Sequence, residues 1–322
     1  MSLTPYLINN RELIAFLPLQ QELKFTSDKN YLFNLSYLKV LNIIGDRGSE
    51  FLQGQITCDL REVKANQMQQ GALCNLKGRI LALFDVIDWH GLHLILPQDL
   101  MSDTQASLNK TALFSQVKLE PSTGYQLLGF QLNQPNDTIP FNAKLPLEKH
   151  GVIQGDNYCC YHLTHNLYIF IVTTPSIQNE IDIFMPNQWR GSLAWHALQL
   201  QTHQVEIYPL TRGLFLPHRL GLQHSGHLSF NKGCYKGQEI IARTHYRAKL
   251  KHELKLFKIQ TNKKLQSGLR LFNSDGKVEI GELIDFCPTD NGQYMIAVSA
   301  FFDHAKQVLI EGHETELTLH KM

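Results

Sequence analysis

Residues 71–97 read GALCNLKGRILALFDVIDWHGLHLILP, and they are the clearest guide to the architecture of this chain. Lys77-Gly78 and His90-Gly91 interrupt apolar, strand-like runs at the spacing expected for hairpin turns. Three antiparallel strands are therefore predicted here. Residues 31–45 (YLFNLSYLKVLNIIG) add a strand before them, and residues 98–113 add a helix after them. Antiparallel strands with interposed helices predict an α+β fold.

The middle of the chain continues this mixture. Residues 157–174 (NYCCYHLTHNLYIFIVTT) are strand-like, and residues 176–200 are expected to hold one or two helices that contain Trp189 and Trp195. Residues 203–233 are irregular and contain several glycines. An irregular stretch of this length inside a compact protein is more often functional than idle.

The character of the sequence changes after about Ala248. Short strand-like segments alternate with turn residues such as Asp275-Gly276 and Asn291-Gly292. Their spacing predicts a small antiparallel barrel. We therefore expect a body at residues 1–247, formed as one unit or as two subdomains, and a C-terminal β-barrel at residues 248–322.

Composition and motifs exclude several classes of function. The 322 residues are 43% hydrophobic with a formal net charge of +1, so the total charge predicts no polyanion partner. The longest apolar run, residues 167–172, is far shorter than the roughly 20 residues that span a bilayer, and the N-terminus lacks a signal-peptide pattern. No GxGxxG, P-loop, GxSxG or HExxH motif occurs. Six cysteines without a CxxC pair indicate free thiols in the cytoplasm.

One cysteine has a different setting, in residues 231–247 (NKGCYKGQEIIARTHYR). Cys234 has Lys232 and Lys236 on either side, and a helix is predicted to begin near Gly237. Cations and helix N-termini favour a thiolate, so Cys234 is the candidate functional thiol. The alternative is a small buried residue that tightens a turn. The other cysteines lie in apolar or strand-like patterns and are predicted to be structural: Cys58, Cys74, Cys159, Cys160 and Cys287.

Residues 232–239 (KGCYKGQE) resemble the K-G-C-Y-x-G-Q-E signature of the YgfZ family, folate-binding relatives of the glycine cleavage T-protein. The resemblance extends to residues 51–59 (FLQGQITCD) and to Lys77-Gly78-Arg79, and it spans most of the chain. It implies a T-protein-like folate-binding body of antiparallel sheets with helices, followed by a small β-barrel. Cys234 is the signature thiol, and the other motif residues are Lys232, Gly233, Tyr235, Gly237, Gln238, Glu239 and Arg243.

The resemblance also implies a cofactor, tetrahydrofolate or a derivative. Of two family tryptophans associated with folate, Trp195 matches the second, whereas the first falls at Leu38, where the aromatic is missing and Tyr37 is the neighbour. Gln201 stands where the T-protein has the carboxylate of its E-A-G motif. The T-protein has an acidic pair for aminomethyl transfer after the glycine that corresponds to Gly78, but here residues 79–82 contain no carboxylate, and Asp85 and Asp88 come too late to match. We therefore expect folate binding without classical T-protein turnover.

Three hypotheses follow, and whether the chain is an enzyme stays open among them. In the first, which the resemblance implies, it is a folate-binding accessory protein for iron–sulfur-dependent enzymes, notably in tRNA methylthiolation. Its partners would be those enzymes or their assembly factors, with tRNA contacted indirectly. In the second, it is a folate-dependent aminomethyl or one-carbon transferase. In the third, it is a thiol-bearing interaction module without folate.

Local charge and histidines add two weaker signals. Residues 232–264 carry ten lysines and arginines against two glutamates. This surface could hold a folate polyglutamate tail or touch tRNA phosphates, although alternation along a strand favours a solvated face. Three histidine pairs share an i,i+3 spacing: His90/His93, His162/His165 and His224/His227. No motif supplies three or four ligands, so no metal site is predicted.

Overall fold

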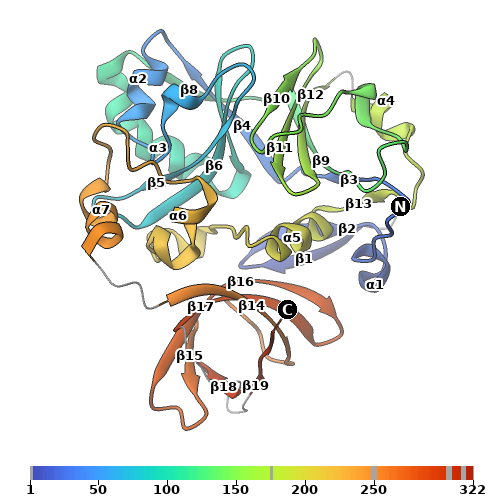
Figure 1. The fold of residues 1–322 in the computed structure, drawn as a ribbon, viewed down its shortest axis with the longest axis vertical. Helices are drawn as coiled ribbons and strands as arrows, with labels where there is room; N and C mark the ends of the chain where they lie inside the picture. The colour runs from blue at the N-terminus through green and yellow to red at the C-terminus, as the bar shows by residue number, and fades with distance from the viewer. Residues whose placement is uncertain (1–2, 175–176, 248–251, 302–306, 313–316, 322) are drawn as a thin grey trace.

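A computed structural model describes residues 3–174, 177–247, 252–301, 307–312 and 317–321. Figure 1 shows three β-sheet lobes, two above and one below, with helices and a short hairpin between them. The hairpin pairs β1 (Thr4–Ile8) with β2 (Arg11–Ala15). None of the helices in the described part of the chain is long and apolar enough to cross a bilayer. The fold is mixed α+β, as predicted.

The first lobe is a five-stranded antiparallel sheet that contains the three strands predicted at residues 71–97. Its strand order is β5 (Gln69–Cys74), β6 (Ile80–Asp88), β7 (Leu92–Pro97), β4 (Leu38–Ile44) and β8 (Lys118–Pro121). Both predicted turns are present. Gly78 has a φ of +68° and Gly91 of +124°, which explains why glycine stands at each turn. The predicted helix at 98–113 is a 3₁₀ turn followed by α3 (Met101–Ala112).

The second lobe is a six-stranded sheet. Its order is β10 (Val152–Gln154), β11 (Tyr158–Thr164), β12 (Leu167–Thr173), β9 (Tyr125–Gln131), β3 (Tyr31–Asn34) and β13 (Trp189–Arg190). The strand-like stretch at 157–174 is the β11–β12 hairpin. Alternation along β11 places Cys159 and Cys160 in separate hydrophobic clusters on opposite faces of the sheet.

The prediction of one strand over residues 31–45 is wrong. The strand breaks at residues 35–37, where the Ser36 N–H donates to Asn34 Oδ1 at 2.8 Å. Before the break, β3 belongs to the six-stranded sheet, and after it, β4 belongs to the five-stranded sheet. The chain therefore changes lobes here, and Leu38 begins β4 directly after the crossing.

The helices are short and fill the spaces between sheets. The others are α1 (Leu19–Glu22), α2 (Gly48–Gln53), α4 (Ile177–Asp182), α5 (Ser192–Gln201), α6 (Leu222–Ser225) and α7 (Gln238–Arg247), with 3₁₀ turns η1 (Leu60–Glu62), η2 (Gln98–Leu100), η3 (Leu113–Ser115), η4 (Pro140–Asn142), η6 (Pro209–Thr211) and η7 (Pro217–Leu220). Trp195 lies in a helix, α5, as predicted. The helical prediction for Trp189 is wrong, because this residue lies in β13 and pairs in parallel with Leu32 of β3.

The third lobe is a seven-stranded antiparallel sheet made of residues after α7. Its order is β19 (Leu317–Thr318), β18 (Gln307–Ile310), β15 (Arg270–Asn273), β16 (Glu279–Asp290), β17 (Gln293–Phe301), β14 (His252–Gln260) and β20 (His320–Lys321). The edge strands β19 and β20 are consecutive in the chain, so the sheet curls back on itself as a small barrel. The predicted boundary at 247/248 adjoins residues 248–251, which lie outside the described residues, and it stays a prediction.

A buried polar network joins the barrel to the body. Asp285 of β16 accepts hydrogen bonds from Tyr208 Oη at 2.7 Å and from the Glu206 N–H at 3.0 Å. His196 of α5 donates from Nε2 to Phe286 O at 3.1 Å and lies 3.5 Å from Asp285 Oδ1. A buried carboxylate is tolerated only with partners of this kind. The network therefore fixes how the barrel sits against α5.

Candidate functional site

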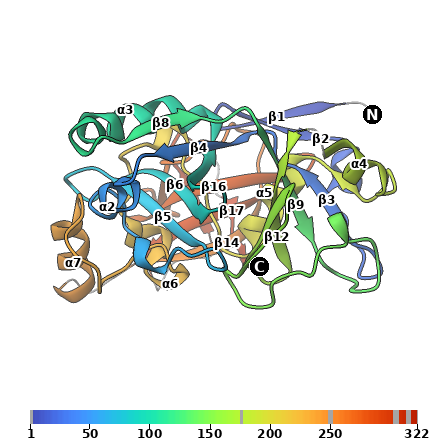
Figure 2. The same ribbon diagram turned by 90° about the horizontal axis from the view of Figure 1, so that it is seen from above.

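Motifs that are far apart in the sequence meet beside α7, which lies at one end of the molecule in both views (Figure 1 and Figure 2). The stretches involved are residues 51–59, the hairpin turn at 75–79 and residues 232–239. Lys232 Nζ donates to Ile56 O at 2.8 Å and to Cys58 O at 2.6 Å. The Lys236 N–H donates to Gly54 O at 3.1 Å. The signature segment is therefore held by the segment that contains Gly54 and Cys58.

The hairpin turn at residues 75–79 contacts the start of α7 through two glycines, Gly78 and Gly237. Gly237 has a φ of +84°, and a Cβ there would lie 2.5 Å from Asn75 O and 3.1 Å from Gly78 Cα. A Cβ on Gly78 would lie 3.2 Å from side-chain atoms of Ile240 and Ile241. Only glycine permits this approach. The glycines of the two motifs thus serve one contact.

A tight loop leads from Lys232 into α7. The Tyr235 N–H donates to Gln238 Oε1 at 3.2 Å, and the Lys232 amine lies 5.2 Å from the centre of the buried Tyr235 ring. Burial lowers the pKa of Lys232 to about 8. Glu239 and Arg243 are exposed on α7. Lys232, Tyr235 and Gln238 therefore shape the loop, whereas Glu239 and Arg243 face solvent.

Cys234 is exposed, whereas the other five cysteines are buried. The alternative that Cys234 is a buried turn residue is therefore wrong. Burial raises the pKa of Cys58 and of Cys74 to about 12, which keeps both thiols protonated and unreactive. The Lys232 amine, which the sequence places near the thiol, is instead engaged with two backbone carbonyls. The thiol is exposed to solvent on a loop that hydrogen bonds anchor to residues 54–58.

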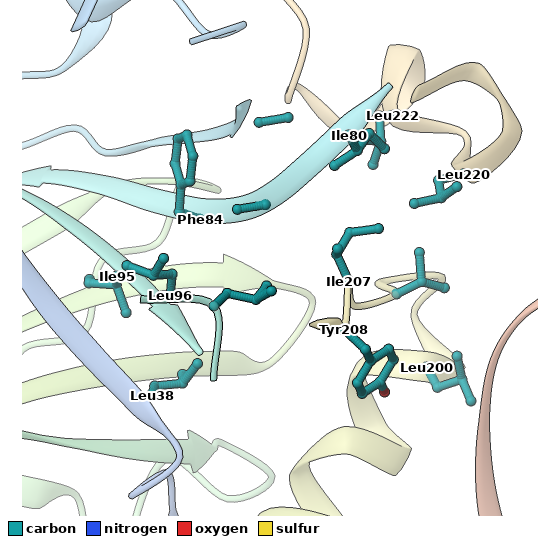
Figure 3. Close-up of a cluster of buried hydrophobic side chains, with 14 of the residues drawn as sticks. Leu38, Ile80, Phe84, Ile95, Leu96, Leu200, Ile207, Tyr208, Leu220 and Leu222 are labelled. Atoms are coloured by element: carbon teal, nitrogen blue, oxygen red, sulfur yellow. The ribbon is translucent and has the colours of Figure 1, made fainter. Parts of the chain in front are cut away.

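A second candidate site is a cavity of about 80 Å³ where the lobes meet, here called the central cavity. Its walls come from β4, β6 and β7 of one sheet, from β11 and β12 of another, and from residues 203–207. Tyr37 and Leu38 both line it. Figure 3 shows Leu38 and Ile95 on one side, opposite Ile207. The family position with the missing aromatic is thus a wall of this cavity.

Asp85 of β6 lines the central cavity, although in the sequence it comes too late after Gly78 to match the acidic pair of the T-protein. Its carboxyl accepts hydrogen bonds from Gln70 Nε2 at 3.1 Å and from Tyr161 Oη at 2.8 Å. Both partners are neutral. Burial raises the pKa of Asp85 to about 6, and these two hydrogen bonds oppose the rise. The cavity therefore contains a carboxyl group that titrates close to neutral pH.

Glu206 is the second carboxylate of the cavity wall, and it too was missed. It accepts from Tyr37 Oη at 2.7 Å and is paired with Arg11, which also pairs with Asp99 at 2.8 Å. Gln201, at the place of the T-protein's E-A-G carboxylate, is exposed at the end of α5 and is not part of the cavity wall. Glu206, five residues later, supplies a carboxylate to the cavity instead.

Two amide oxygens make the central cavity richer still in hydrogen-bond acceptors. Gln70 Oε1 and Gln199 Oε1 are buried and have no hydrogen-bond partner among the described residues. Both residues line the cavity. A buried acceptor without a partner is unfavourable by about 1–3 kcal/mol. The cavity therefore suits a group that donates several hydrogen bonds, and the amino and ring N–H groups of a reduced pterin have this chemistry.

Trp195 does not belong to the central cavity wall. Its indole is fully buried, 5.3 Å from the Phe33 ring centre, and a Cβ on Gly129 would lie 2.5 Å from it. Gly129 pairs across strands with Ile169, which does line the cavity. The indole is thus one strand away from the cavity. A contact between Trp195 and folate stays a prediction.

Two larger cavities adjoin the central one. The first, here called the outer cleft, has a volume of about 710 Å³ and shares Leu38 with the central cavity. The second, here called the histidine cavity, has a volume of about 420 Å³ and shares His203, Gln204 and Ser225 with it. Within the described ranges, no group of three or more His, Cys, Asp or Glu side chains is arranged to hold a metal ion.

Comparison with curated proteins finds relatives described as the tRNA-modifying protein YgfZ. The relative from Hamiltonella defensa is 31% identical over 214 residues, which cover 65% of this chain and 64% of that protein. The one from Colwellia psychrerythraea is 27% identical over 243 residues, covering 74% and 75%. The one from Yersinia pestis is 29% identical over 230 residues, covering 69% of each. The chain thus spans slightly less than two thirds of the Hamiltonella relative. No family model matches the chain.

Comparison with solved structures identifies the fold. The glycine cleavage system aminomethyltransferase T from Bartonella henselae superimposes with a TM-score of 0.70, covering 99% of this chain and 93% of that one. The two sequences are 16% identical. A likeness at this identity establishes the fold and leaves the activity open. The expected T-protein-like architecture is confirmed.

Proposed function

Because this chain belongs to the family of the tRNA-modifying protein YgfZ, we propose that it is a folate-binding accessory protein. In this role it supports iron–sulfur-dependent enzymes of tRNA modification, notably methylthiolation, in the cytoplasm. Its direct partners are these enzymes or their assembly factors, and tRNA is reached through them. The cofactor is tetrahydrofolate or a derivative.

The observation that carries the proposal is the exposed Cys234 thiol on its anchored loop. Three motif stretches converge to hold this loop, through Lys232, Lys236 and the contact between Gly78 and Gly237. These contacts anchor the loop while its thiol stays exposed, and binding residues are often carried on loops that a scaffold positions in this way. The thiol lies on the surface, where a partner protein can reach it.

The folate half of the proposal is supported by the chemistry of the central cavity. Asp85, Gln70 and Gln199 would accept hydrogen bonds from the pterin, and Leu38 and Tyr37 would flank it. The cavity alone is small for a folate, and the adjoining histidine cavity supplies further room. Trp195 would support this wall from behind, through Gly129.

A folate-dependent aminomethyl or one-carbon transferase is the second candidate, and Asp85 is the observation that favours it. The four residues after Gly78 contain no carboxylate, yet Asp85 lines the central cavity. An anionic group close to the reacting carbon is what aminomethyl transfer needs. Turnover of an aminomethyl donor with tetrahydrofolate, lost in Asp85→Asn, would favour this candidate over the accessory role.

Anaerobic calorimetry with tetrahydrofolate tests the proposed cavity. Leu83 lines the central cavity only, and Ser102 lines the outer cleft only. Leu83→Trp should fill the central cavity and weaken binding by about tenfold or more, whereas Ser102→Trp should leave the affinity unchanged. Circular dichroism of both variants controls for folding. The opposite result would move folate to the outer cleft, and no binding by the wild type would favour a thiol-bearing module without folate.

A further inference from the structure

The hairpin turn that contacts α7 carries an exposed leucine. Leu76 is 79% exposed and follows Asn75, whose carbonyl accepts from the Gly78 N–H at 2.9 Å. Asn75 Oδ1 also accepts from the N–H groups of Lys77 at 2.9 Å and of Arg79 at 3.0 Å. These three hydrogen bonds close the turn, so the backbone that carries Leu76 is anchored while its side chain stays exposed.

A second exposed leucine adjoins the same hairpin. Leu214 is 36% exposed, and its carbonyl accepts from Arg79 Nη1. The residues on either side of it bond the hairpin strand, because the Gly213 N–H donates to Ile80 O at 2.7 Å and the Ile80 N–H donates to Phe215 O at 2.9 Å. Single exposed leucines are common on protein surfaces, but two on one hairpin offer apolar contact to a partner.

The exposed Cys234 thiol lies on the loop that meets this turn. A Cβ on Gly237 would lie 2.5 Å from Asn75 O, the carbonyl that precedes Leu76. Cys234 comes three residues before Gly237, so their backbones are at most about 11 Å apart. An interface of ordinary size buries about 800 Å² on each protein. One partner can therefore cover Leu76 and reach the thiol at the same time.

The charged groups around the turn are mainly cationic. Lys77 is exposed beside Leu76, and the half-buried Lys236 precedes Gly237. Neither lysine forms an ion pair with an acidic side chain among the described residues. Glu239 is the acidic residue of the stretch 232–247. A partner that covers this surface must therefore bring acidic groups to the lysines, because a charge buried without a partner is unfavourable.

The mixture of apolar and cationic groups favours a protein over a nucleic acid. Lysines alone would suit phosphates. The Leu76 side chain, however, has neither an aromatic face on which a base could stack nor a polar group that could read a base edge. An apolar anchor with charged residues at its rim is the usual anatomy of a protein–protein interface.

The hairpin surface is here defined by four residues: Leu76, Leu214, Lys77 and Lys236. We propose that this surface docks a protein whose complementary face has an apolar pocket bordered by Asp and Glu side chains. The proposal rests on the function proposed above, and it identifies the surface through which the partner reaches Cys234. Leu76 is the anchor, because it is the more exposed of the two leucines.

Complementation of a strain lacking this gene tests the anchor, with methylthiolated tRNA nucleosides measured by mass spectrometry at low, matched expression. Leu76→Ser should lower methylthiolation at least about tenfold, as the loss of an interface anchor does. Leu76→Met, which restores an apolar side chain, should recover most of it. Leu147→Ser is the matched control, because Leu147 is 88% exposed in the loop before β10, and it should have no effect.

Charge reversal tests the acidic rim of the partner. Lys77→Glu should lower methylthiolation about tenfold, whereas Lys110→Glu, at an exposed position of α3, should not. In all variants the circular dichroism spectrum and the rate of Cys234 alkylation should equal those of the wild type. These two measurements show that the fold and the thiol are intact.

Four outcomes would overturn the proposal. Loss of methylthiolation in Cys234→Ser but not in Leu76→Ser removes the docking surface and leaves the proposed function intact. A loss in Lys77→Glu without one in Leu76→Ser assigns the surface to a nucleic acid. An equal loss in Leu147→Ser, or altered alkylation of Cys234 in Leu76→Ser, shows a general effect on the protein. Full restoration by both Cys234→Ser and Leu76→Ser removes this inference together with the proposed function.

Discussion

Asp85 is the residue whose local setting departs furthest from what its sequence neighbours suggest. It follows the apolar run Ile80-Leu81-Ala82-Leu83-Phe84 of β6, yet its carboxyl lines the central cavity. The partner that makes this position acceptable, Tyr161, comes from a strand of the other sheet, 76 residues away. A pairing between residues so far apart leaves no local pattern in the sequence. The sequence alone therefore gives no reason to assign Asp85 or Glu206 to a binding site.

The raised pKa of Asp85 predicts a specific dependence of stability on pH. The folded-state value of about 6 exceeds the ordinary 3.8, so the folded protein holds this proton more tightly than the unfolded chain. The free energy of unfolding should therefore fall as pH rises from about 4 to 6. Asp85→Asn should flatten this fall and raise stability at pH 7 by about 1–3 kcal/mol. Urea unfolding across this range measures it, and an unchanged pH profile would contradict the assignment.

Cys234 could be selected from the sequence, because its cationic and glycine-rich surroundings differ from those of the other cysteines. The exposure of Cys234 could not be predicted from the sequence, because free cysteine is usually buried. The role of Lys232 was also misjudged. A lysine two residues from a thiol favours a thiolate only if its amine stays nearby, and here the amine is drawn to Ile56 O and Cys58 O.

At the scale of elements, turn chemistry was the reliable guide. The hairpins of residues 71–97 were predicted because glycine marks both turns, and the positive φ values explain its presence. The break at residues 35–37 was not predictable, because no glycine or proline marks it and it is defined by pairing with two different sheets. The two-residue strand β13 likewise exists only through its pairing with β3.

The start of α7 offers a matched pair of glycine substitutions. Gly237→Ala places a Cβ 2.5 Å from Asn75 O at a φ of +84°, so it should lower the free energy of unfolding by about 1–3 kcal/mol. Gly233→Ala, four residues earlier, meets nothing within 4 Å and should leave stability unchanged. Thermal unfolding of both variants measures the difference. Equal melting temperatures would show that the two motifs do not depend on this close contact.

At the scale of the whole molecule, the buried network at Asp285 couples the barrel to the body. Burial lowers the pKa of His196, and the adjacent Asp285 carboxylate more than offsets this, raising it to about 9. Because Asp285 also bonds the backbone of Glu206, the network reaches the wall of the central cavity. The barrel and the proposed folate site are therefore linked through one set of hydrogen bonds.

This coupling predicts how stability changes above neutral pH. The folded-state pKa of His196 exceeds the ordinary 6.5, so its contribution is complete below pH 6.5 and is lost as pH rises towards 9. The loss should reach about 3 kcal/mol. Asp285→Asn should remove this pH dependence, and urea unfolding of both proteins at pH 6.5, 7.5 and 9 measures it. Other titrating groups, such as Lys232, contribute equally to the pH dependence of both proteins. Parallel profiles of unfolding free energy against pH for the wild type and Asp285→Asn would therefore refute the coupling.

The central claim is that the exposed Cys234 thiol supports tRNA modification, and methylthiolated nucleosides in cellular tRNA report on it directly. Mass spectrometry would compare a strain lacking this gene with strains that carry the wild-type gene, Cys234→Ser, or the neighbouring surface substitution Asn231→Ser. We predict that the wild type and Asn231→Ser restore methylthiolation, whereas Cys234→Ser, expressed at the same level, stays at the level of the deletion. Full restoration by Cys234→Ser would contradict the claim.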